Sequence, residues 1–337
     1  MKLHNIELTS AEIGYLWASY MNESASIPVL TYFSRIVEDL EIKEIIDISL
    51  EKAKEHLSSV TEIYKQENYP IPFGYTMDEV NLEAPKLYSD TYMLYFVRNL
   101  GKAGIAANGM AFSMGARKDI RELYYKFLLD STEVEDRSKE VMLSKGVFIR
   151  APYIATPKEP SFVKKGSFLK GWFGERRTLS AEEIAHIFLN TNNAYGKALL
   201  IGFAQTVRSE ELRSYFIRGI EVARSQIDTY RTLLEESTLP SPMTWDTEVN
   251  DSTIPPFSDK LMLFHICQLN AIGVGNIGGS LALSMRRDIA TKYSKLIKDI
   301  GLFAEDGLNL MIKNEWFERP PQAIDREHLA KDENKYS

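Results

Sequence analysis

Residues 88–98 read YSDTYMLYFVR, and 169 positions further on residues 257–267 read FSDKLMLFHIC. The similarity continues without a gap over 88–153 and 257–322, where 17 of 66 positions are identical. Self-similarity at one long period indicates that a structural unit occurs twice in the chain. We therefore predict two homologous units, residues 1–150 and 179–320, with a linker at 151–178 and a polar tail at 321–337.

The composition is that of a soluble globular protein, with 44% apolar and 26% charged residues in a chain of 337. The formal net charge is −7, so the basic excess typical of nucleic-acid binders is missing, and we expect no nucleic-acid partner. The single cysteine, Cys267, excludes an internal disulfide and a multi-cysteine metal site. Residues 1–10 show no charged segment followed by an apolar run, so we expect a cytoplasmic location.

Each unit contains four long segments in which apolar residues recur with helical spacing. Strand-like alternation with regular turn signals is missing from the sequence, so we predict an all-α protein. Ser10 and Ser180 are the expected N-caps of the first helix in each unit. The predicted helices span 10–38, 41–67, 88–114 and 117–145 in the first unit, and 180–208, 210–236, 257–284 and 287–314 in the second.

The lengths of the connections predict the topology of each unit. Two or three residues join helix 1 to helix 2 and helix 3 to helix 4, which predicts antiparallel hairpins. The connections 68–87 and 237–256 between helices 2 and 3 are much longer. A loop of about twenty residues can reach about 65 Å, more than the roughly 40 Å length of such a helix. We therefore predict two tandem ferritin-like four-helix bundles, each with a long crossover; a simple up-down bundle with a slack loop is the alternative.

Two motifs resemble those of a known family. The segment 171–184 reads GWFGERRTLSAEEI, and the corner between the last two helices, 284–288, reads SMRRD. Together with the tandem bundles they resemble domain of unknown function 3231, a family of spore-forming Gram-positive bacteria whose members are often labelled spore-coat-like by similarity to coat F. The resemblance covers nearly the whole chain and implies a tandem ferritin-like fold with no assigned activity. The first unit departs from the pattern at 115–119, GARKD, where only the Arg and the Asp are shared.

A ferritin-like bundle raises the hypothesis of a di-iron site. Such a site needs a Glu from each of two helices and Glu-x-x-His from the other two. The third helix of each unit has no acidic residue between positions 91 and 116 or between 260 and 287. We therefore predict no conventional di-iron centre and no cofactor. In place of ligands, apolar residues should fill the bundle interiors: Met93, Leu94, Leu100, Met262, Leu263 and Leu269.

Four residues are the only metal-ligand candidates that the sequence offers. Glu51 and Glu221 align between the units on helix 2, and Glu183 with His186 forms the one Glu-x-x-His in the chain. The last pair lies near the start of its helix, where a capping acid followed by a half-buried aromatic position is the favoured interpretation. His186 and His265 should lie too far apart to share a metal.

We therefore expect a non-enzymatic structural or interaction protein, in the cytoplasm or associated with the spore or spore coat. The alternative is a metal-binding or redox ferritin-like protein with an unconventional site. Whether the protein is an enzyme stays open at this point, with a non-enzymatic role favoured. Protein partners and self-association also stay open.

Two apolar features of the third helix in the second unit indicate packing. Gly273-Val-Gly-Asn-Ile-Gly278 matches a dinucleotide fingerprint but lies within a helix, without the preceding strand that the fingerprint needs. We therefore predict that Gly273 and Gly278 lie at a close helix–helix contact. The uncharged stretch 261–285 is long enough to span a bilayer, but a buried central helix, and no transmembrane segment, is the favoured interpretation.

The linker combines basic and aromatic residues. Between Lys158 and Arg177 there are six Lys or Arg and only two Glu. Contact with an anionic surface through 158–177, either a membrane or a polymer, is one interpretation of this pattern. We favour the other, in which the aromatic side chains dock onto the bundles and the charges face water. The aromatic residues concerned are Phe162, Phe168, Trp172 and Phe173.

Overall fold

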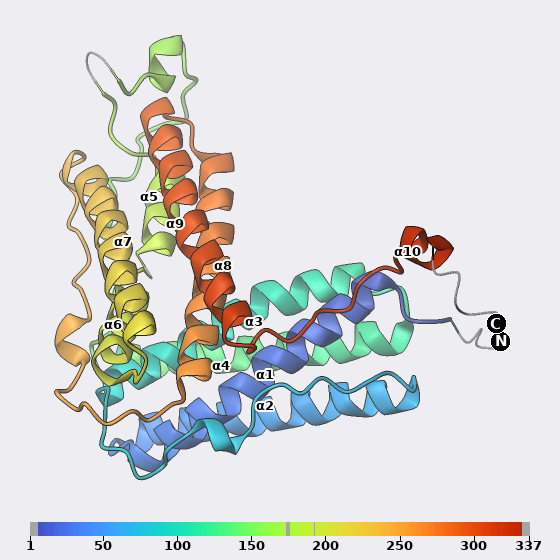
Figure 1. Cartoon of the computed structure of the whole chain (residues 1–337). Helices are drawn as coiled ribbons and strands as arrows, with labels where there is room; N and C mark the ends of the chain where they lie inside the picture. The colour runs from blue at the N-terminus through green and yellow to red at the C-terminus, as the bar shows by residue number, and fades with distance from the viewer. Residues whose placement is uncertain (1–5, 173–175, 192, 332–337) are drawn as a thin grey trace.

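The chain forms two helical units in tandem, as the repeat predicts. A computed structural model describes residues 6–172, 176–191 and 193–331. The described part is all-α, without a β-strand, and its long helices belong to two bundles that lie crosswise in an L-shaped molecule (Figure 1). The first bundle consists of α1 (Ser10–Ile36), α2 (Leu40–Gln66), α3 (Asp90–Met114) and α4 (Lys118–Ser144).

The second bundle repeats this order with one change. Its members are α5 (Ala181–Asn190), α6 (Asn193–Thr206), α7 (Glu210–Glu235), α8 (Asp259–Leu283) and α9 (Arg287–Lys313), and the short α10 (Arg326–Lys331) follows. The prediction of one continuous helix over 180–208 was wrong, since this stretch is divided into α5 and α6. The division falls in the sequence Asn-Thr-Asn-Asn at 190–193. Short polar side chains bond to nearby backbone, as Asn190 does to His186 and Thr191 to Phe188, and they weaken a helix.

Helix 2 and helix 3 of each bundle begin at the same end. The carboxylate of Asp90, at the start of α3, accepts hydrogen bonds from the backbone N–H groups of Glu38 and Asp39, just before α2. Asp259, at the start of α8, accepts in the same way from Arg208 and Ser209. The long connections therefore run the length of each bundle (Figure 1). This geometry excludes the alternative of an up-down bundle with a slack loop.

A capping glutamate closes the opposite end of each bundle. Glu12 forms a capping box with Thr9, which is the actual N-cap of α1 in place of the predicted Ser10. Its other oxygen accepts from the N–H groups of Ala116 and Arg117, at the corner between α3 and α4. Burial raises the pKa of Glu12, but these backbone hydrogen bonds outweigh it and hold the pKa below its usual value.

The second bundle has the same corner. Glu183 forms a capping box with Ser180 and accepts from the N–H of Arg286. The buried guanidinium of Arg286 binds Asp288 at 2.7 Å, as Arg117 binds Asp119 in the first bundle. The Arg and Asp shared by the two corner sequences are therefore ion-paired in both units.

The two crossover loops pair with each other across a pseudo-two-fold axis. The N–H of Ser89 donates to the carbonyl oxygen of Glu248 at 2.9 Å, and the N–H of Ser258 donates to that of Glu79 at 2.8 Å. In addition, the hydroxyl of each serine donates to the carboxylate of the glutamate that its N–H contacts. Each contact thus occurs twice with the units exchanged, which is the pattern of an isologous dimer interface.

Aromatic side chains fill the space behind these loops. The hydroxyl of Tyr88 donates to the carbonyl oxygen of Leu199, and that of Tyr92 donates to Tyr195, both at 3.0 Å. The Tyr95 ring packs on Trp245 with centroids 4.4 Å apart. One continuous cluster of buried residues, from Met21 to Met311 in sequence, crosses from one bundle to the other.

The helix α8 belongs to this core. It is the one described helix that is long and apolar enough to cross a membrane by length and composition. Ten of its residues are buried, among them Met262 and Leu263, which occupy the interior as predicted. Met93 and Leu94 are buried in the first bundle, whereas Leu100 and Leu269 are partly buried against the core.

The prediction for the glycines was correct at one position and wrong at the other. A Cβ on Gly273 would lie 2.9 Å from the Ile300 side chain, so this glycine is at a helix–helix contact. A Cβ on Gly278 would meet nothing within 4 Å, so the predicted close contact does not exist there. In the first bundle Gly101 approaches the backbone of α4, since a Cβ there would lie 2.9 Å from the backbone nitrogen of Glu135.

These distances predict opposite effects for two alanine substitutions in α3. Gly101→Ala should lower the free energy of unfolding by about 1–3 kcal/mol, because the backbone of α4 must shift. Gly109→Ala, with nothing within 4 Å of the added atom, should leave it unchanged or raise it by up to about 1 kcal/mol. Urea denaturation of both variants measures the difference, and equal losses would contradict the packing described.

Candidate functional site

A buried histidine lies between two carboxylates in the middle of the first bundle. The Nδ1 atom of His56, on α2, lies 2.9 Å from Oε1 of Glu23 on α1. Its Nε2 atom lies 3.0 Å from Oδ2 of Asp130 on α4. The imidazole ring stacks on Phe127, with ring centroids 3.8 Å apart. Three helices therefore converge on one ring, which we call the His56 cluster, with Glu23, Lys52, Asp130 and Glu133 as its other members.

A lysine one turn away from the histidine completes this cluster. The ammonium group of Lys52 lies 2.6 Å from Asp130 and 2.9 Å from Glu133. Lys52 and His56 are four residues apart on α2, so their side chains share one face of the helix. His56 itself is in the buried stripe of α2, together with Ser49, Ala53 and Val60.

The charges of the cluster support one another. Burial lowers the pKa of His56, but the hydrogen bonds and charges of Glu23 and Asp130 outweigh this effect and raise it above the usual value. Burial raises the pKa of Asp130, and the hydrogen bonds from Lys52 and His56 more than reverse it. The arrangement therefore favours the protonated imidazole, which can donate to both carboxylates, with an ammonium group beside them.

The second bundle lacks this cluster. Ala194, Gln226 and Asp299 stand where the first bundle has Glu23, His56 and Asp130. Val222 and Leu302 take the places of Lys52 and Glu133. Only the aspartate is retained, so the cluster is a property of one unit.

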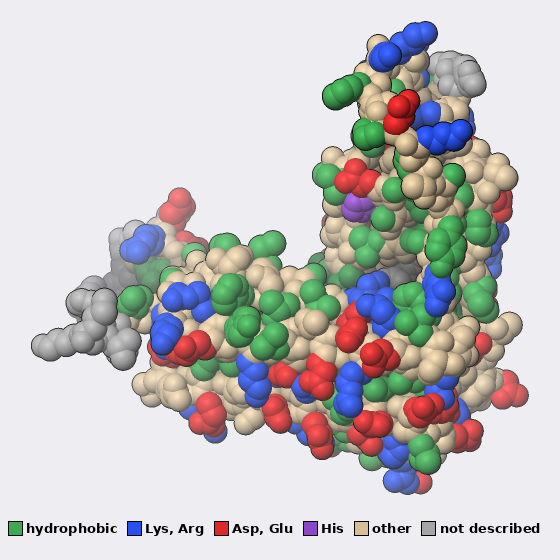
Figure 2. Space-filling view, turned by 180° about the vertical axis from the view of Figure 1, so that it is seen from behind, with side chains coloured by type: hydrophobic (Ala, Val, Ile, Leu, Met, Phe, Trp, Pro, Cys, Tyr) green, Lys and Arg blue, Asp and Glu red, His purple; other side chains and the backbone are tan. Residues whose placement is uncertain are grey.

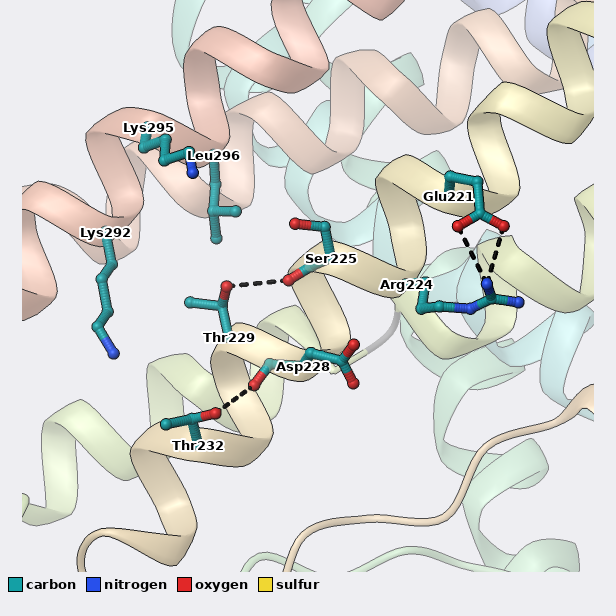
Figure 3. Close-up of a pocket in the computed structure, with 9 residues that line it drawn as sticks. All are labelled: Glu221, Arg224, Ser225, Asp228, Thr229, Thr232, Lys292, Lys295 and Leu296. Atoms are coloured by element: carbon teal, nitrogen blue, oxygen red, sulfur yellow. Dashed lines mark hydrogen bonds and ion pairs between the residues drawn. The ribbon is translucent and has the colours of Figure 1, made fainter.

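A surface groove occupies the matching face of the second bundle. It has a volume of about 560 Å³ and lies between α7 and α9 (Figure 3). In the first bundle Lys126 pairs with Glu55 across this face at 3.0 Å, whereas the corresponding positions hold Lys295 and Ser225. The residues lining the groove are Glu221, Arg224, Ser225, Asp228, Thr229, Thr232, Lys292, Lys295 and Leu296.

The polar side chains that line the groove from α7 bond to other groups of the same helix. Glu221 pairs with Arg224 at 2.9 Å, and the hydroxyl of Thr229 donates to the carbonyl oxygen of Ser225 (Figure 3). The groove is open to solvent, and its lysines come from α9 alone. It does not gather the convergent polar groups that a reaction site needs.

The four metal-ligand candidates from the sequence do not meet. Glu51 and Glu221 are exposed on α2 and α7. Glu183 is buried, but both its oxygens are engaged by Arg177, at 2.8 Å each. His186 lies 3.4 Å from the Ser280 hydroxyl instead of facing its Glu-x-x-His partner's carboxylate.

Burial favours the neutral forms of the histidine and the cysteine of α8. The Nε2 atom of His265 lies 3.3 Å from the carbonyl oxygen of Ala25, between the bundles, and burial lowers the pKa of His265 to about 4. Burial raises the pKa of the Cys267 thiol to about 12. His186 contacts residue 280 of α8, fifteen residues from His265, or about 22 Å along the helix. The expected separation of the two histidines is therefore present.

The His56 cluster was missed because its members come from separate parts of the sequence. Glu51, Glu55 and His56 lie close together on α2, but they do not have the Glu-x-x-His spacing of a di-iron site. The available signal was different: a lysine and a histidine four residues apart, with the histidine in the apolar stripe of an amphipathic helix. A charged group in that stripe needs partners from other helices.

Within the described ranges, no three His, Cys, Asp or Glu side chains are placed to hold a metal ion. The reason in the His56 cluster is chemical. Both ring nitrogens of His56 are engaged by carboxylates, at 2.9 and 3.0 Å, whereas a metal needs a free nitrogen lone pair. The ammonium group of Lys52 supplies the positive charge between Asp130 and Glu133. The residues present therefore do not fit a di-iron centre.

Comparison with known proteins identifies the family. The family described as protein of unknown function (DUF3231) matches residues 1–159 and 167–329, one match for each unit. The chain belongs to this family. The two matches confirm the tandem repeat and the resemblance seen in the sequence.

Among solved structures, this DUF3231 protein is similar to a chain from Bacillus halodurans C-125 described as a "putative spore coat protein". The two share 14% sequence identity with a TM-score of 0.41, and the match covers 45% of this chain and 98% of the other. No curated protein matches the chain.

The raised pKa of His56 predicts a pH dependence of stability. A group whose pKa is higher in the folded state stabilises the fold below its unfolded pKa, and this contribution is lost as pH rises through the folded value. The melting temperature of the natural protein should therefore exceed that of a His56→Gln variant most at about pH 6, with a difference that shrinks toward about pH 9. Glutamine is chosen because Gln226 fills the same position in the second bundle. A difference independent of pH would show that the imidazole is neutral.

Removing a carboxylate should be costly in the first bundle only. Asp130→Ala leaves His56 and Lys52 without their shared acceptor and should lower the free energy of unfolding by about 1–3 kcal/mol. Its aligned residue, Asp299, forms no ion pair among the described residues, so Asp299→Ala should change it by about 0.5 kcal/mol or less. Denaturant unfolding of the two variants checks this, and similar losses would contradict the role assigned to the cluster.

Proposed function

We propose that this protein is a non-enzymatic structural or interaction protein, built from two ferritin-like bundles and associated with the spore or spore coat. The observation that carries the proposal is the state of the His56 cluster inside the first bundle. The partners of His56, Lys52 and Asp130 are one another and their neighbours, so no group is left poised toward a substrate or metal. A catalytic site would instead present a group with a free lone pair or proton toward a cavity.

The energetics of the cluster agree with a structural role. Ion pairs in a bundle interior contribute little net stability, but they penalise alternative packings that would leave a charge unpaired. The cluster joins α1, α2 and α4 of the first bundle. In the sequence, α1 and α2 precede the long crossover and α4 follows it. It therefore favours one register among these three helices.

The spore association is inferred from the family. Its members are often labelled spore-coat-like, as the sequence resemblance implies. A soluble form in the cytoplasm before incorporation is part of the same proposal. Structural proteins of an assembled layer function through surfaces, and both bundles offer long exposed helix faces for this purpose.

One observation favours a second candidate, a metal-binding or redox protein with an unconventional site. Glu23, His56 and Asp130 come from helices 1, 2 and 4, the helices that could form a site when helix 3 lacks acids. Displacement of Lys52 from Asp130 and Glu133 would have to precede such binding. We therefore propose the structural role and use the alternative as the competing outcome of the test.

Metal analysis decides between the two functions. The full chain, purified without chelator, should contain no stoichiometric iron, manganese or zinc by inductively coupled plasma mass spectrometry. Added Fe²⁺, Mn²⁺ or Zn²⁺ should not raise its melting temperature, because no metal binds preferentially to the folded state. A His56→Gln variant should behave in the same way.

Stoichiometric metal that is lost in His56→Gln would overturn the structural proposal and establish the alternative. The spore association is tested separately, with an antibody against the chain on fractionated spores of its sporulating host. We expect the protein in the coat extract. Its confinement to the mother-cell or vegetative cytosol would contradict the association, whatever the metal content.

A further inference from the structure

The linker is anchored at the free end of the second bundle. The Arg177 guanidinium stacks on the Phe168 ring at 4.1 Å and donates to its carbonyl oxygen at 3.0 Å. The same guanidinium binds Glu183, the capping residue of α5. Gly171 is packed so closely on the Asp288 carboxylate that a Cβ would overlap it. The end of the linker is thereby fixed to the corner of the bundle that lies farthest from the first unit (Figure 1).

The preceding part of the linker projects beyond this corner. Figure 2 shows a protrusion with basic and hydrophobic side chains at the tip of the second bundle. Phe162 is 93% exposed and Val163 is 62% exposed. Docking of the linker aromatics onto the bundles was therefore the wrong expectation for Phe162, and Trp172 is also half exposed; only Phe168 is docked, through Arg177. Phe173 lies outside the described residues.

The charge of this protrusion is opposite to that of the whole protein. Residues 151–172 contain four lysines and one acid, Glu159, whereas the chain carries a net charge of −7. The four lysines and Glu159 are exposed. Lys164 and Lys165 directly follow the apolar pair Phe162 and Val163. Two further apolar side chains, Leu283 and Met285, are exposed at the neighbouring corner between α8 and α9.

We propose that this tip, residues 158–165, is a contact site for an anionic phospholipid surface. Aromatic and aliphatic side chains that sit at the headgroup level, with lysines beside them, are the pattern of interfacial membrane binding. Each lysine near an anionic surface adds an attraction of its own, and it weakens with salt. The position of the tip lets it reach a bilayer while the acidic body of the protein stays away from it.

A soluble polyanion explains only part of the pattern. It would account for Lys158, Lys164 and Lys165, but it would give no reason for the exposure of Phe162 and Val163. Isolated exposed apolar residues are common on protein surfaces, whereas Phe162 and Val163 are adjacent and directly precede two exposed lysines, so they form an apolar patch beside basic charge. The apolar pair therefore favours lipid over polyanion.

Vesicle flotation of the full chain tests the proposal. The probes are vesicles of phosphatidylcholine alone and vesicles of phosphatidylcholine with phosphatidylglycerol. We expect flotation with the anionic vesicles only, reduced by high salt. Phe162→Ser/Val163→Ser and Lys164→Glu/Lys165→Glu should each weaken the apparent affinity by about tenfold or more.

The matched control is Lys292→Glu/Lys295→Glu, which reverses two exposed or half-exposed lysines in the groove of the same bundle. It should reduce flotation far less than the reversal at the tip. Circular dichroism of each variant shows that the fold is kept, as expected for side chains without buried contacts.

Three results would overturn the proposal. They are no flotation with anionic vesicles, equal flotation of the tip variants and the natural chain, and binding to a soluble polyanion such as polyphosphate that Phe162→Ser/Val163→Ser leaves unchanged. The last result would assign the lysines to a polyanion instead of a bilayer. Metal content and spore location are independent of all three outcomes.

Discussion

The pairing of the two crossover loops is the contact on which the arrangement of the molecule depends. A loop that runs the length of a bundle carries many backbone donors and acceptors, and those that become buried must find partners. Here the loop of each unit finds them in the other unit, where Ser89 and Ser258 bond to Glu248 and Glu79. The same contacts fix the start of α3 and α8. The aromatic core between the bundles is thereby closed, so neither bundle is complete without its neighbour.

Buried charge is placed at a few points of this frame and is paired at each. Glu12 closes the end of the first bundle with hydrogen bonds from backbone N–H groups, whereas Glu183 at the matching end of the second bundle also binds Arg177. In the middle of the first bundle, His56 is stabilised by carboxylates from two other helices. The second bundle solves the same packing problem with neutral residues. An unpaired buried charge is costly. This cost explains why the first bundle has all members of the cluster, whereas the second bundle has lost all of them except the aspartate, Asp299.

The sequence predicted the architecture well because its signals there are local or repeated. The repeat, the helical periodicity and the lengths of the connections required only neighbouring residues, and the two helices 3 were placed within two residues of their ends. The division between α5 and α6 was missed because the helical spacing of apolar residues is the same on both sides of 190–193, although α5 ends at Asn190. Contacts between distant segments could not be predicted in this way. The residues near Gly278 do not indicate that its helix face is open. The residues near His56 do not indicate that Glu23 and Asp130 are its partners. Side-chain exposure on the linker likewise depends on where the chain is anchored.

In a symmetric dimer the two subunits have the same sequence, whereas two related units joined in one polypeptide can differ at any position. In a homodimer every substitution appears on both sides of the axis, whereas here each side evolves alone. Tyr88 and Phe257 occupy equivalent positions, yet only the tyrosine has a hydroxyl, which donates across the interface to Leu199. The linker also holds the partners at a fixed ratio and at high effective concentration, so dilution does not separate them. One half can thus specialise in internal ion pairing while the other carries the exposed tip, and the shared interface preserves both.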